Sequence, residues 1–135
     1  MLLGFKETAG VTGVAGLITN LNVNGLTNLK YLSCNHLALT SLDVSNLTNL
    51  TDLYCTNNDI TSLNLTGLVN LQRLDYNYNL LANLSLINLP NLKYLNCAYN
   101  QLVTLDVLNL TSLETLNCSY NQITTLNLSG LNSLV

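Results

Sequence analysis

The sequence contains little charge, and positive charge is scarcest. Only 8% of its 135 residues are Asp, Glu, Lys or Arg, against roughly 25% in ordinary globular domains. Four Lys and Arg residues stand against seven acids, which gives a formal net charge of −3 at pH 7. Nucleic-acid binding requires a basic surface that neutralises phosphates, so we expect no nucleic-acid partner.

Long apolar runs and helical periodicity are also missing. No run approaches the roughly 18 apolar residues that a membrane-spanning helix needs, so we expect no membrane span. Residues 1–6 are too short an apolar stretch for a secretory signal. This fits either a cytoplasmic chain or a piece trimmed from a larger secreted protein. No segment sustains a 3.6-residue period, so no regular helix is predicted.

Residues that carry chemistry are sparse and do not converge. His36 is the only histidine, and the acids are scattered along the chain. We find no Ser/His/Asp, Cys/His or glycine-rich phosphate constellation. The cysteines lie far apart in the sequence, which is unlike the C-x-x-C spacing of metal ligands. We therefore predict no catalysis, no cofactor and no metal.

What the sequence does have is leucine at one fixed interval. The leucines concerned are Leu29, Leu50, Leu71, Leu92, Leu113 and Leu134. A fixed period of about 20–50 residues is typical of a solenoid. We expect one array over residues 1–135. Residues 1–28 would form a degenerate N-terminal coil, residues 29–133 five full 21-residue coils, and residues 134–135 the start of an incomplete coil.

The residue pattern of each coil predicts two short strands. If Leu29 is position 1, apolar residues recur at positions 4 and 6 and again at positions 14 and 16. Alternation of this kind indicates strands with one buried face. Stacked coils should then form two parallel sheets, at about 4.8 Å per layer. The predicted fold is a mainly β repeat solenoid with two parallel sheets of short strands and little or no helix. The upstream residues Val11 and Ile18 are predicted to fit the same frame.

These residues resemble the leucine-rich repeat family. Residues 92–102, which read LKYLNCAYNQL, fit its L-x-x-L-x-L/C-x-x-N-x-L core, and residues 102–107, LVTLDV, look like the second half of the 21-residue bacterial class called IRREKO. The resemblance covers nearly the whole chain. It implies a bacterial, non-catalytic scaffold that binds proteins, with binding residues that differ from member to member.

Two inward columns are predicted to be structural. Position 6 is expected to hold buried, reduced thiols, because parallel inward side chains suit disulfide geometry poorly. Its members are Cys34, Cys55, Cys97 and Cys118. The resemblance implies that position 9 is an asparagine ladder bonded to turn backbone. Its members are Asn58, Asn79, Asn100 and Asn121. Leu37 breaks this ladder, so the first turn is expected to differ in shape.

Tyrosines dominate the predicted outward face of the first sheet. Tyr78, Tyr99 and Tyr120 share position 8 of consecutive coils and should form a stacked stripe. The set is completed by Tyr31 and Tyr94 at position 3 and Tyr54 at position 5. Two interpretations stay open: a ligand surface for peptides or sugar rings, or cross-strand packing alone. Position 5, including Asn96, is expected to face outward.

The other sheet is predicted to expose small polar residues and one apolar contact patch. The patch consists of Ile87, Leu108 and Val103. Such a patch suggests a contact surface, although single exposed apolar residues are common on any protein. The threonine array is too irregular to favour ice binding, which remains a distant alternative.

The function predicted from the sequence is a non-catalytic binding scaffold with a protein partner. The alternatives are a carbohydrate-binding adhesin module that uses the tyrosine stripe, and a purely structural spacer. We expect the chain to belong to a larger secreted or cell-surface protein, with a cytoplasmic location as the alternative. Because no polar repeat follows Leu131, end-to-end self-association or further repeats are expected at the C-terminal end.

Overall fold

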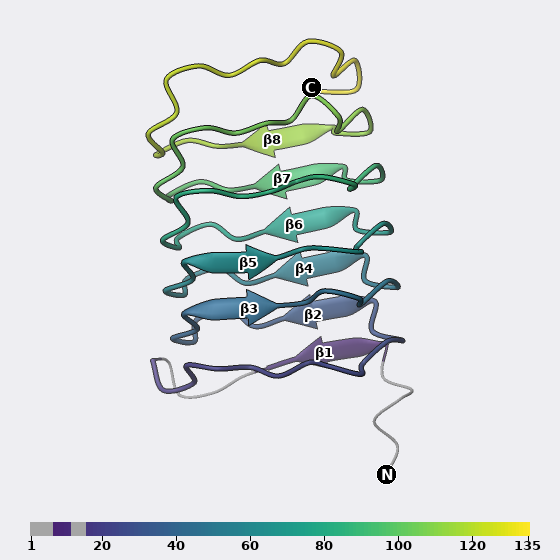
Figure 1. The fold of residues 1–135 in the computed structure, drawn as a ribbon, viewed down its shortest axis with the longest axis vertical. Coiled ribbons are helices and arrows are strands. Elements are labelled where there is room, and N and C mark those ends of the chain that lie inside the picture. Colours follow the sequence, from purple (N-terminus) through teal and green to yellow (C-terminus); the bar gives the residue numbers. More distant parts are fainter. Residues whose placement is uncertain (1–6, 12–15) are drawn as a thin grey trace.

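The computed structural model describes residues 7–11 and 16–135 and shows a parallel β-solenoid (Figure 1). Its coils stack along one axis, and each coil contributes short extended segments joined by turns. The described residues form eight short strands. They are β1 (Thr8–Gly10), β2 (Tyr31–Ser33), β3 (Ser41–Asp43), β4 (Asp52–Tyr54), β5 (Ser62–Asn64), β6 (Arg73–Asp75), β7 (Tyr94–Asn96) and β8 (Thr115–Asn117).

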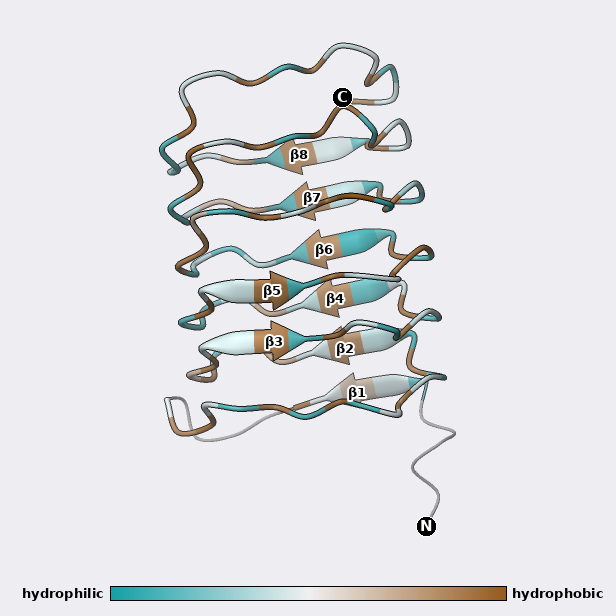
Figure 2. Cartoon of the chain, in the orientation of Figure 1, coloured by the Kyte–Doolittle hydropathy of each residue, from teal (hydrophilic) through white to brown (hydrophobic). Residues whose placement is uncertain are grey.

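Six of these strands form one parallel sheet in the order β1-β2-β4-β6-β7-β8. From β2 onward, each strand pairs with the equivalent strand of the next coil, exactly one repeat further along the chain, as Leu32 does with Leu53. The middle residue of each strand is hydrophobic and points inward, while its two neighbours point outward. Figure 2 shows this alternation as an apolar band within each strand. The repeat therefore becomes a continuous ladder with one buried face.

The core is the stack of inward columns. Leu29, Leu50, Leu71 and Leu92 occupy position 1 of successive coils, and all four are fully buried. No coil can bury this face alone, so each one depends on its neighbours for stability. The predicted fold class, a repeat solenoid of parallel β structure without regular helix, is confirmed.

The second sheet is shorter than predicted. Only β3 and β5 pair on that side of the described chain, so the expectation of a second strand in every coil is wrong for the coils that begin at Leu71, Leu92 and Leu113. In these coils no backbone hydrogen bond joins segment 82–88 to 103–109, or 103–109 to 124–130. Hollows separate neighbouring segments there instead. The six-stranded sheet joins the coils at every step, whereas on the opposite side strand pairing joins only the coils of β3 and β5.

The first coil also departs from the predicted frame. A strict repeat would pair Gly10 with Tyr31, but the residue that pairs with Tyr31 is Thr8. Val11 therefore takes position 6 rather than the predicted position 4. Ile18 keeps its place, since its carbonyl accepts a hydrogen bond from the N–H of Ala38, as the equivalent carbonyl does in the next coil. The additional residues of this coil thus lie between Val11 and Ile18. Residues 1–6 and 12–15 of the predicted N-terminal coil lie outside the described residues.

Candidate binding surface on the six-stranded sheet

Asparagine side chains fix the turn that follows each strand of the large sheet. Asn100 donates to the carbonyls of Tyr76 (3.1 Å), Cys97 (3.2 Å) and Ala98 (3.2 Å), and accepts from the N–H of Leu81 (3.1 Å). The same four contacts recur at Asn58 and Asn79, and again at Asn121. Each amide satisfies turn groups that would otherwise be buried without partners. At the break in the ladder, His36 keeps the left-handed backbone of its equivalents, with a φ of 58°. The turn still differs as expected, because residues 35–36 form a turn where the equivalent residues of the later coils do not.

A second ladder of side-chain hydrogen bonds, at position 21, was not predicted from the sequence. The side chain of Asn49 donates to the carbonyl of Thr27 at 2.7 Å, that of Asn70 to Thr48 at 2.8 Å, and that of Asn91 to Val69 at 2.8 Å. Ser112 and Ser133 make the equivalent contact in the following coils. The recurrence of asparagine at the same position of three successive coils was the available signal.

The cysteines form an inward column of free thiols. Cys34, Cys55 and Cys97 are fully buried, whereas Cys118 is half-buried. Burial raises the pKa of Cys34 and of Cys97 from 9.0 to about 12. Tyr76 interrupts the column, and its buried hydroxyl has no hydrogen-bond partner among the described residues. Such neutral, buried thiols are poor nucleophiles and serve as small hydrophobic groups.

Six of the seven tyrosines lie on the outward side of the six-stranded sheet or in the turn after it. Tyr31, Tyr54 and Tyr94 belong to the strands, and the rings of Tyr31 and Tyr54 make a tilted contact with centroids 5.5 Å apart. Tyr94 is half-buried; burial, followed by the nearby Asp75 carboxylate, raises its pKa. The tyrosines that the sequence singled out are therefore on one side of the molecule.

The remaining three form a stacked column, here called the tyrosine column: Tyr78, Tyr99 and Tyr120. Successive ring centroids are 4.1 Å apart, with interplanar angles of 8° and 10°. The hydroxyls interact along the column, since hydrogen bonding to Tyr78, and then to Tyr120, raises the pKa of Tyr99. Rings stacked face to face leave their edges and hydroxyls for a ligand. Within the column, only the outer faces of Tyr78 and Tyr120 lack a stacked ring.

The backbone of the tyrosine column is unusual. All three tyrosines have φ values of 52–54°, in the left-handed region, which bulky residues rarely adopt. The coil has a second left-handed position, position 18, and there the chain uses glycine or asparagine. These residues are Gly25, Asn46, Gly67, Asn88 and Gly130. Tyrosine is therefore placed where the backbone itself favours a smaller residue.

The free energies of backbone strain and of ring stacking indicate that the tyrosine column does not add to the stability of the fold. Three bulky residues in the left-handed region cost about 1–2 kcal/mol each. Two ring stacks return about 0.5–1.5 kcal/mol each. The stacking does no more than offset the backbone cost, so cross-strand packing alone does not explain the three tyrosines.

The ion pairs of the described residues lie on the same side. Ion pairs join Lys30 to Glu7 at 3.0 Å and Lys93 to Glu114 at 3.2 Å. A third pair joins Arg73 to Asp52 at 3.7 Å. Each pair is exposed and contributes little stability. Every Lys or Arg in the described residues is thus paired across the strands of this sheet.

Asn96 corrects the prediction that position 5 always faces solvent. It is only 7% exposed. Its amide donates to the Asp75 carboxylate at 3.2 Å and accepts from the N–H of Ala98 at 3.3 Å. Asp75 and Tyr94 contact this side chain, which the alternation of single residues could not show.

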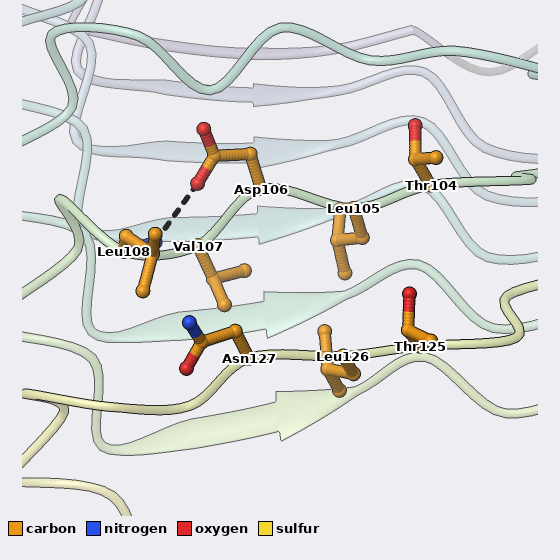
Figure 3. A pocket seen from close by; sticks show the side chains of 8 residues that line it. All are labelled: Thr104, Leu105, Asp106, Val107, Leu108, Thr125, Leu126 and Asn127. Carbon is orange, nitrogen blue, oxygen red and sulfur yellow. Dashed lines mark hydrogen bonds between the residues drawn. The ribbon is translucent and has the colours of Figure 1, made fainter.

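The predicted apolar patch lies on the other side of the solenoid. Ile87 is 72% exposed, Val103 53% and Leu108 44%. Leu108 borders a hollow of about 360 Å³ between segment 104–108 and the next coil (Figure 3), whereas Ile87 borders a separate hollow of about 220 Å³. Val103 lines neither hollow. The three residues are exposed, but they do not line one common hollow.

The described residues contain neither a cluster of metal ligands nor a membrane-spanning helix. Within residues 7–11 and 16–135, no three His, Cys, Asp or Glu side chains are grouped to hold a metal ion. None of the described residues belongs to a helix with the length and apolarity needed to cross a bilayer.

Comparison with known proteins agrees with the architecture. A model of leucine-rich repeats, in two copies, matches residues 90–133. A solved structure, described as the functional domain of InlJ from Listeria monocytogenes that includes a cysteine ladder, is similar with a TM-score of 0.83 and 37% sequence identity. The chain is a leucine-rich repeat protein. The similarity covers 86% of this leucine-rich repeat chain and 26% of the InlJ chain. No curated protein matches the sequence.

Proposed function

We propose that this chain is a non-catalytic protein-binding module whose contact surface is the outward side of the six-stranded sheet, including the tyrosine column. The observation that carries the proposal is tyrosine in the left-handed region at Tyr78, Tyr99 and Tyr120, because stacking does not explain it. Tyrosine and arginine are enriched at protein interfaces. Leucine-rich repeat proteins commonly act as interaction scaffolds, which supports the same conclusion.

A carbohydrate ligand is the alternative, and the column geometry does not favour it. Sugar rings bind best against open aromatic faces, but the two faces of Tyr99 are both occupied by other tyrosines. A peptide can use ring edges and hydroxyls as well as the flanking strand residues. We further propose that the chain functions as part of a larger secreted or cell-surface protein. Its similarity to about one quarter (26%) of a longer bacterial chain supports membership of a larger protein.

The test replaces the tyrosine column without damaging the fold. The triple variant Tyr78→Asn, Tyr99→Asn and Tyr120→Asn should have an unfolding free energy at least as high as the parent, since relief of the left-handed backbone matches or exceeds the lost stacking. Urea denaturation measures this. Protein partners captured by the parent in cross-linking mass spectrometry should be lost with the triple variant.

A matched control changes the other side of the solenoid. The double variant Ile87→Ser and Leu108→Ser should retain the captured partners. If the double variant loses them and the triple variant keeps them, the apolar side is the contact surface and the proposal is wrong. Binding of the parent to a glycan array, abolished in the triple variant, would instead establish the carbohydrate alternative.

A further inference from the structure

The end of the tyrosine column nearest the N-terminus has a ring face on which no other aromatic ring stacks. Position 8 reads His36, Asn57, Tyr78, Tyr99 and Tyr120, and all five residues share the same left-handed backbone conformation. Asparagine replaces the ring at position 57. Tyr78 therefore stacks on Tyr99 alone, and no ring of the described residues covers its other face. Tyr78 is 46% exposed, compared with 37% for Tyr99 in the middle of the column.

The neighbouring turn, one coil before Tyr78, carries a free carboxylate, that of Asp59. The backbone N–H groups of Asn57 and Asn58 donate to the carbonyls of Asn77 and Tyr78, at 3.0 and 3.2 Å. The turn at residues 57–59 is thus hydrogen-bonded to the turn of the next coil, which contains Tyr78. Asp59 is exposed, and its carboxylate forms neither a hydrogen bond nor an ion pair within the described part of the chain.

Asp59 differs in this respect from the other described acids. Glu7, Asp52 and Glu114 are paired with cations. Asp43, Asp75 and Asp106 accept a hydrogen bond from the backbone two residues further on. Because every described cation is already paired, no cation of this surface neutralises Asp59.

We propose that Tyr78, Asn57 and Asp59 form a binding site for an arginine guanidinium of a protein partner. The face of an aromatic ring carries negative charge density and attracts a cation. A guanidinium is planar, stacks on such a face, and presents donors that match a carboxylate. The Asn57 side chain donates to Thr56 at 3.5 Å, which leaves its carbonyl oxygen to accept a further donor. This site rests on the proposed function and deepens it by specifying the chemistry of the partner.

The test uses a small probe on the intact chain, so it does not depend on finding the partner. N-acetyl-arginine amide, titrated by NMR, should shift the ring signals of Tyr78. The citrulline analogue has the same shape without the charge and should bind about tenfold more weakly. Tyr120 is an internal comparison, because its outer face also lacks a stacked ring, at the opposite end of the column, and the residues that follow it, Asn121 and Gln122, carry no charge. Its signals should respond less.

Two variants locate the site. Asn57→Tyr supplies the missing ring at a position whose backbone already carries tyrosine in three other coils, so it should extend the column and abolish arginine binding while the fold is retained. Asp59→Asn should weaken binding about threefold or more, as expected for the loss of an exposed ion pair. Amide chemical shifts away from residues 57–59 and 77–79 confirm that both variants are folded.

Several outcomes would overturn this assignment. They are equal binding of citrulline and arginine, arginine binding that survives Asn57→Tyr, and stronger binding of p-cresol or methyl glucoside, which would assign the face to an aromatic or a sugar. If arginine fails to bind while the triple tyrosine variant still loses its protein partners, only this site is wrong. If arginine binds but no protein depends on the column, the proposed function is wrong.

Discussion

Asn100 illustrates how one side chain joins two coils. Its amide satisfies three carbonyls and one N–H, contributed by its own coil and the preceding one. We predict that Asn100→Ala lowers the unfolding free energy by about 1–3 kcal/mol, since buried backbone groups lose their partners. Chemical denaturation tests this. The matched control is Asn83→Ala, at an exposed residue without a side-chain hydrogen bond. The control should change stability by no more than about 0.5 kcal/mol, as is usual for surface substitutions.

Asn96 shows why an exposed control residue for Asn100→Ala could not be chosen from the sequence alone. Strand alternation places it outward, yet it is buried and bonded to Asp75. Alternation reports the direction of a side chain, whereas burial also depends on the size of its neighbours in adjacent coils. Equal losses for Asn100→Ala and Asn83→Ala would contradict the assigned role of the ladder.

The strands and turns of the large sheet follow closely from the repeat. The spacing of Leu32, Leu53 and Leu74 predicts both the register and the buried face, because a coil of constant length returns each leucine to the same place. The stacking of the tyrosine column follows for the same reason. Its left-handed backbone could not be predicted, since tyrosine argues against that conformation. The short second sheet was also missed, because its sequence pattern persists in coils that do not pair.

The two sides of the solenoid should differ in hydrogen exchange. The amides of β4, β6 and β7 are bonded into a ladder with neighbours on both sides. Segments 82–88 and 103–109 make no backbone hydrogen bond to each other. We predict slow exchange in these strands and fast exchange in segments 82–88 and 103–109, as expected where amides lack partners. Exchange mass spectrometry with peptides that separate residues 94–97 from 103–109 measures it. Similar protection in both would mean that the second sheet extends further.

Asymmetry between the two sides is the feature that relates architecture to binding. One side has hydrogen bonds at every coil junction and holds six tyrosines and all the described ion pairs. The other side has gaps between coils and exposes Ile87 and Leu108. A rigid surface costs less entropy to hold in its binding conformation than one that must first be ordered. The better-ordered side is therefore the better platform for the tyrosines.

The buried thiol column makes the stability of the solenoid depend on alkaline pH. Burial raises the pKa of Cys34 and Cys97 from 9.0 to about 12, so the folded chain keeps both protons where the unfolded chain has lost them. The contribution of each thiol is fully present below pH 9 and is lost as pH rises toward 12. The expected slope is about 1 kcal/mol of unfolding free energy per thiol for each pH unit. Burial also raises the pKa of Tyr76 above its usual 10.0, which adds a further loss at higher pH.

Urea denaturation at a series of pH values between 8 and 11 measures this slope. The Cys34→Ala variant should be less steep than the parent, because one titrating group has been removed, whatever its effect on stability at neutral pH. Cys118 serves as the comparison: it is only half-buried, whereas Cys34 is fully buried, and burial raises its pKa as well. Cys118→Ala should therefore leave most of the slope unchanged. A parent whose stability is flat across this range would show that its thiols are reached by water, and that the column is not closed.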